Sequence, residues 1–157
     1  MTATRTTSTA ELTGWVTFLR AHAAITRELS AELQREHGLT LHDYEVLLHL
    51  ARADGGMMRR VDLSKSVLLS ASGITRLLEG LERAGLVEKA TCQSDGRVSY
   101  AKLTETGHDR LREAAATHVR GVEALFASRY SASELETLAQ LLSRLPLAGS
   151  ASTDCGE

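Results

Sequence analysis

Hydroxyl and guanidinium groups recur along one face of a short segment, residues 70–83. The apolar residues Ile74, Leu77, Leu78 and Leu81 fall at positions i, i+3, i+4 and i+7, which predicts a helix with one buried face. The opposite face carries Ser72, Thr75, Arg76, Glu79 and Arg83. Side chains of these types exchange hydrogen bonds with base edges and neutralise phosphates. The segment therefore has the chemistry of a helix that reads a DNA groove.

A second set of candidate DNA contacts lies between two predicted strands, 86–91 and 98–103. The pair Asp95-Gly96 between them is a strong hairpin signal. Arg97 at the tip suits an A·T-rich minor groove, whose negative potential attracts a guanidinium. Asp95 is expected to bond the backbone or Arg97 and so to hold the tip in shape.

Helices are expected in most of the rest of the chain. Apolar residues keep a helical period over about 11–36, 40–52 and 60–68, and Gly38 ends the first of these runs. Thr104, and Ser131 or Ser133, have the side-chain types that cap two further helices. A short helix, a reading helix and a hairpin in this order form a winged helix-turn-helix. The expected fold class is mainly α with a small β-hairpin wing, flanked by N- and C-terminal helices.

The candidate DNA-binding residues come from the short helix, the reading helix and the wing. They are Lys65, Ser70, Ser72, Thr75, Arg76, Arg83, Asp95 and Arg97. The charge distribution agrees with this assignment, although the whole chain has a net charge of −2. Residues 59–102 hold eight basic and five acidic side chains, and the remainder holds 10 basic and 15 acidic ones. A cationic module on an acidic body fits a protein that meets phosphates on one side.

Length and composition favour one globular domain. The chain has 157 residues, of which 43% are hydrophobic and 24% charged. No run approaches the roughly 18 apolar residues of a membrane span, and the first ten residues lack the apolar core of a signal peptide, so a cytoplasmic location is expected. Cys92 and Cys155 are too far apart for a C-x-x-C motif and do not form a disulfide framework.

The segment 63–107 resembles the MarR (multiple antibiotic resistance regulator) family. The resemblance rests on G-L-V after the reading helix, D-G-R at Asp95 to Arg97, and L-T-x-x-G from Leu103 to Gly107. With the flanking helices it covers roughly Leu12 to Leu145. The chain departs from the family at Gly96, where a basic residue is common.

The resemblance implies an obligate homodimer, built by the terminal helices, whose two recognition helices meet successive major grooves. Leu12, Trp15 and Leu19 agree with this expectation, because they have no obvious partner in the winged module. The expected organisation is a single domain at 11–147, with the winged helix-turn-helix at about 40–103, dimerisation helices at about 11–37 and 104–146, and disordered tails at 1–10 and 148–157.

The resemblance also implies a small anionic or phenolic effector lodged between the dimer helices and the winged module. Aromatic walls and a cationic anchor for it are expected from Trp15, Phe18, Arg20, His22 and Tyr44. No enzyme is predicted, because the phosphate-binding, zinc-protease and nucleophile-elbow motifs are absent from the sequence.

No metal site or cofactor is predicted, because no two histidines stand at i, i+4. Two sensing variants of the same fold stay open: a zinc-responsive one, from clustered residues such as His37, His42 and His49, and a thiol-responsive one, from Cys92.

The predicted function is a DNA-binding transcriptional regulator, acting as a repressing homodimer on a palindromic operator and released by an effector. The alternative from another class is a helical protein-interaction module without DNA binding.

Overall fold

The computed structural model describes residues 9–67, 69–91 and 98–145. The predicted tails and the tip of the wing, including Asp95 and Arg97, lie largely or wholly outside these ranges. The helices are α1 (Thr9–His37), α2 (Leu41–Arg52), α3 (Arg60–Ser66), α4 (Ala71–Arg83), α5 (Glu105–Leu125) and α6 (Ala132–Leu142). The strands are β1 (Met57–Arg59), β2 (Val87–Thr91) and β3 (Ser99–Leu103), and two 3₁₀ turns are η1 (Asp54–Gly56) and η2 (Ala127–Arg129). The expected fold class is confirmed.

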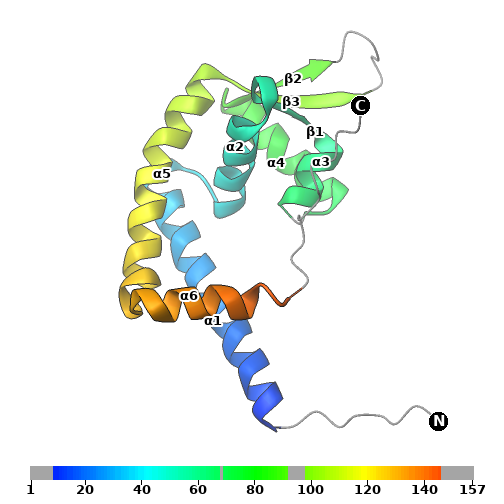
Figure 1. Ribbon diagram of the computed structural model, residues 1–157. Coiled ribbons are helices and arrows are strands. Elements are labelled where there is room, and N and C mark those ends of the chain that lie inside the picture. Colours follow the sequence, from blue (N-terminus) through cyan, green and yellow to red (C-terminus); the bar gives the residue numbers. More distant parts are fainter. Residues whose placement is uncertain (1–8, 68, 92–97, 146–157) are drawn as a thin grey trace, which may run out of the picture.

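The chain forms a head and a pair of long helices (Figure 1). The head contains α2, α3, α4 and the sheet, and it lies to one side of α5. Helix α1 packs along α5, and its N-terminal half extends beyond α6, away from the head. Six fully buried side chains lie at the centre of the core: Leu33, Val46, Leu47, Leu50, Leu63 and Leu78.

The sheet has one more strand than the sequence predicted. Its order is β1-β3-β2, and both pairs are antiparallel. The predicted hairpin is present with Val87 opposite Leu103 and Thr91 opposite Ser99. The additional strand, β1, pairs Met57 with Lys102 across a long sequence separation. It anchors the start of α3 to the wing.

The last helix ends earlier than expected. The C-terminal helical region was expected to run to about residue 146, but α6 ends at Leu142, with Ser143 as its C-cap. Its start was predicted correctly as one of two alternatives, because Ser131 is the N-cap and forms a capping box with Glu134. The same arrangement opens α2, where Thr40 and Asp43 cap each other.

Helix α5 is attached to the head through Thr104 and Gly107. The Thr104 hydroxyl accepts from the Gly107 N–H at 3.0 Å and donates to the Gly85 carbonyl at 2.7 Å. The Thr104 N–H donates to the Leu86 carbonyl at 3.1 Å. A Cβ at Gly107 would collide with that same carbonyl oxygen and would lie 2.6 Å from Leu103 Cδ1. The residues of the L-T-x-x-G pattern therefore connect the turn after α4 to the start of α5.

Candidate DNA interface

Helix α4 presents its polar face outward, as the sequence predicted. Ile74, Leu78 and Leu81 are buried against the head. Ser72, Arg76, Glu79 and Arg83 are exposed, and their spacing of four, three and four residues places them on one side of the helix. The surface thus offers two guanidinium groups and a hydroxyl on one helical stripe, with a carboxylate between the guanidiniums.

The first turn of α4 uses part of its predicted reading groups for its own structure. Ser70 is the N-cap, and its hydroxyl accepts from the Gly73 N–H at 3.1 Å and lies 3.2 Å from that of Ser72. The Thr75 hydroxyl donates to the Ala71 carbonyl at 2.8 Å, which leaves its oxygen able to accept. Ser72 and Arg76 are consequently the side chains of this turn that are most available to a ligand.

A charged triad holds α4 in the head. The Glu82 carboxylate lies 3.5 Å from Arg60 Nη2 of α3 and 3.5 Å from Lys89 Nζ of β2. Only 18% of the Glu82 side chain and 23% of that of Arg60 are exposed, so solvent screens this pair less than a surface pair. The triad links three elements of the winged helix-turn-helix and so orients the reading helix.

The basic residues described on α3, α4 and the sheet fall into two groups. Arg59, Arg60, Lys89 and Lys102 form ion pairs with acidic residues of the head itself. Lys65, Arg76 and Arg83 form no ion pair within the part of the chain that the structure describes, and all three are exposed. Lys65, Arg76 and Arg83 are among the residues that the sequence analysis proposed for contact with DNA.

Comparison with known proteins decides the family. The model of the MarR family matches residues 37–98. The structure is similar to that of AbsC, a MarR family transcriptional regulator from Streptomyces coelicolor, with 33% identity, a TM-score of 0.82, and coverage of 90% of this chain and 95% of AbsC. The chain belongs to the MarR family. It is a DNA-binding transcriptional regulator and not an enzyme.

Two further structures share the MarR fold. One is Sco3205, a MarR family transcriptional regulator from the same organism in complex with DNA, with 26% identity, a TM-score of 0.84, and coverage of 90% of this chain and 88% of Sco3205. The other is the organohalide-sensing regulator RdhR-CbdbA1625 in its 2,4-dichlorophenol-bound form. It is 18% identical, with a TM-score of 0.75 and coverage of 92% of this chain and 86% of RdhR-CbdbA1625, and it shows the fold alone.

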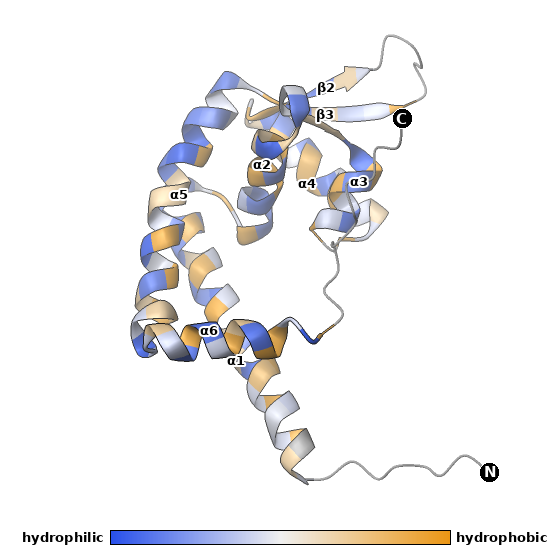
Figure 2. Cartoon of the chain, viewed as in Figure 1, coloured by the Kyte–Doolittle hydropathy of each residue, from blue (hydrophilic) through white to orange (hydrophobic). Residues whose placement is uncertain are grey.

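An apolar surface remains on the terminal helices of this MarR-family chain. Leu12, Trp15, Val16 and Leu19 of α1 are each at least 40% exposed. Leu141 of α6 and Leu145 beyond it are also exposed. Hydrophobic residues recur along the half of α1 that extends beyond α6 (Figure 2). These side chains are apolar surface that the fold of one chain does not cover.

A groove of about 580 Å³ lies between α1, η2 and α6. Its lining includes Phe18, His22, Phe126, Tyr130 and Leu138, and none of its lining residues is Asp, Glu, Lys or Arg. Of the five predicted effector residues, Phe18 and His22 line this groove, whereas Trp15, Arg20 and Tyr44 do not. The Trp15 ring stands 6.3 Å from that of Phe18 and is largely exposed.

Tyr44 belongs to the core of the head instead. It is 5% exposed, and its ring lies 4.6 Å from the imidazole of His118 on α5. Burial lowers the pKa of His118, while the Glu45 carboxylate opposes this shift, and burial raises the pKa of Tyr44. His118 Nδ1 is buried without a hydrogen-bond partner among the described residues. The two rings thus link α2 to α5.

The described ranges contain no group of three or more His, Cys, Asp or Glu side chains that could hold a metal ion. In the same ranges no helix is both long and apolar enough to cross a membrane.

Proposed function

We propose that this MarR-family regulator is a repressor that binds a palindromic operator as a homodimer. The observation that carries the proposal is the outward stripe of α4, where Ser72, Arg76 and Arg83 are exposed and the two arginines form no ion pair with any described residue. Lys65 adds a cation from α3, and Arg97 would add one from the wing. Sco3205, at 26% identity, is known in complex with DNA, which supports the same partner here.

The test is selection of bound sequences from random duplexes, followed by titration of the selected operator at several salt concentrations. Each neutralised phosphate should contribute about −0.9 to the slope of log affinity against log salt. Two related half-sites, with centres about 10 base pairs apart or a multiple of that, are expected. No enriched sequence and no salt dependence would favour a protein-interaction module.

Removing the protein from the cell should raise transcription from promoters that contain the operator, if the protein is a repressor.

The dimer is proposed to form through the exposed apolar residues of α1 and α6. Leu19→Glu places a carboxylate in this surface and should convert the dimer to a monomer in sedimentation experiments at micromolar concentration. Val61→Glu is the matched control, because Val61 is equally apolar and 54% exposed but lies on α3 in the head. A parent protein that sediments as a monomer would refute the dimer.

The groove between α1 and α6 is proposed as the effector site. Because no charged side chain lines it, an uncharged or phenolic aromatic compound should bind more tightly than a carboxylate of the same size. Trp15 is the only tryptophan and lies next to Phe18, so its fluorescence reports occupancy. His22→Ala should weaken binding of a phenol, and Arg20→Ala should not. A benzoate that binds better than the matching phenol, or that depends on Arg20, would move the site elsewhere.

A further inference from the structure

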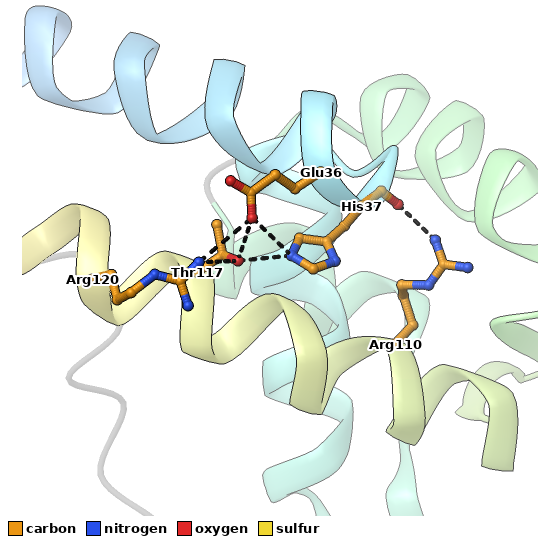
Figure 3. Close-up of polar contacts among 5 residues, drawn as sticks. All are labelled: Glu36, His37, Arg110, Thr117 and Arg120. Atoms are coloured by element: carbon orange, nitrogen blue, oxygen red, sulfur yellow. Dashed lines mark hydrogen bonds and ion pairs between the residues drawn. The ribbon is translucent and has the colours of Figure 1, made fainter.

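Thr117 is a buried hydroxyl at the contact between α1 and α5 (Figure 3). Only 2% of the residue is exposed, and among the described residues it is the polar one that is buried. Its Oγ1 lies 2.9 Å from Glu36 Oε2, 2.9 Å from His37 Nε2 and 3.1 Å from Arg120 Nη2. Glu36 and His37 form the end of α1, whereas Thr117 and Arg120 belong to the middle of α5.

The chemistry of these groups assigns each proton. A hydroxyl has one hydrogen to donate and two lone pairs with which to accept. The Glu36 carboxylate accepts only, so Thr117 donates to it and must accept from both Arg120 and His37. His37 therefore carries a proton on Nε2. Every hydrogen-bonding position of the Thr117 hydroxyl is filled. Loss of this oxygen would remove three contacts at once, and His37, whose side chain is 13% exposed, is the partner least able to replace its contact with water.

The cluster joins α1 to α5 at the end of α1, from which the chain enters the head. Arg110 Nη1 of α5 donates to the His37 carbonyl at 2.7 Å, which fixes the end of α1 from the same side. Gly38 follows with φ +68°, and the Leu39 N–H donates to the Leu33 carbonyl at 3.4 Å. Thr40 then caps α2, the first helix of the head. The chain thus passes from α1 to the head through a short, hydrogen-bonded joint.

We propose that Thr117, with Glu36, His37 and Arg120, is a positioning cluster that sets the angle between the head and the dimerisation helices. In the dimer this angle determines the distance between the two α4 helices, and hence the half-site spacing that the regulator accepts. The inference rests on the proposed dimeric binding of an operator. It assigns to Thr117 a role in DNA recognition although the residue lies on α5, outside the reading surface.

The test compares Thr117→Val with Thr117→Ser, which keeps the hydroxyl. Affinity is measured for the selected operator, for operators with the spacing changed by one base pair in either direction, and for a duplex with a single half-site. Thr117→Val should bind the operator about tenfold more weakly, discriminate less between spacings, and bind the single half-site as the parent does. Thr117→Ser should restore the parent pattern. Thr137→Val is the control, because within the described part of the chain the Thr137 hydroxyl bonds the Ser133 carbonyl of its own helix and no other group.

Three outcomes would overturn the proposal. Thr117→Val could match the parent on every duplex, or it could weaken the half-site and all spacings equally, which would indicate general destabilisation. If Thr117→Val does not fold, Arg120→Met decides, because Arg120 is 61% exposed at its side chain and its replacement leaves the core filled. The third outcome that would overturn the proposal is an Arg120→Met protein that prefers the same half-site spacing as the parent. Failure of the parent to dimerise or to bind any operator would instead refute the proposed function.

Discussion

Substitution of Gly107 by alanine tests the joint between α4 and α5. The added Cβ would collide with the Leu86 carbonyl oxygen and lie 2.6 Å from Leu103 Cδ1. The leucine side chain can rotate, but the carbonyl cannot retreat freely, because it also accepts from the Thr104 N–H at 3.1 Å. The start of α5 must then shift away from β2, and this shift pulls Thr104 from the Gly85 carbonyl.

The expected cost follows from these contacts. Overpacking against an atom that cannot move costs about 1–3 kcal/mol. Loss of the Thr104 hydrogen bonds would add about 1 kcal/mol. The gain in helix propensity from glycine to alanine offsets up to about 1 kcal/mol. We therefore expect Gly107→Ala to lower the free energy of unfolding by about 2 kcal/mol.

Gly80→Ala provides a matched control. Gly80 is also helical, but a Cβ there meets only Arg83 Nη2, at 4.0 Å. The same substitution should therefore raise stability, by about 0.5–1 kcal/mol. Urea unfolding at one fixed protein concentration measures both changes, because the stability of a dimer depends on concentration. A Gly107→Ala protein as stable as the parent would show that α5 does not approach Leu86 as described.

Three further predictions concern His118, Arg76 and Arg97. Burial lowers the pKa of His118, so the unfolded chain takes up a proton on this residue at higher pH than the folded one does. The free energy of unfolding should therefore fall as the pH drops below about 6.5. Urea titrations at several pH values should show a weaker pH dependence for His118→Phe than for the parent. Arg76→Ala should cost roughly 1–3 kcal/mol of operator binding and relax preference at one base of each half-site; an equal loss on all sequences would mean that Arg76 contacts phosphate only. Arg97→Ala should leave the melting temperature and the dimer unchanged, and it should weaken binding most on operators with A·T-rich flanks. If its affinity for such operators equals that of the parent at matched salt, the wing does not insert into the minor groove.

Local patterns predicted the elements that depend on neighbours in sequence. The buried face of α4 follows from the spacing of Ile74, Leu78 and Leu81, and the cap of α5 follows from the type of Thr104. Strand β1 was missed because three residues are too few to show a period. Its partner strand is more than forty residues away, so no local turn signals the pairing.

The functional residues divide in the same way. Arg76 and Arg83 could be assigned to an outward face, since helical periodicity alone determines it. Tyr44 could not be placed, because an aromatic residue on an amphipathic helix suits a core and a pocket equally. The cluster at Thr117 gives no sequence signal at all: a threonine among alanines in a helix contacts His37, 80 residues earlier in the chain. Such a cluster can be recognised only from the three-dimensional structure.

The attachment of α5 to the head makes this helix a lever. It contains 21 residues, which corresponds to a length of about 31 Å. Thr104 and Gly107 fasten one end directly to the turn that follows α4. A tilt of about 5° at the far end of a rod of this length displaces the near end by about 2.7 Å. This displacement approaches the spacing of about 3.4 Å between successive base pairs. In the proposed dimer, a rotation too small to disturb packing at the far end of α5 would therefore move the reading helix out of register with its half-site.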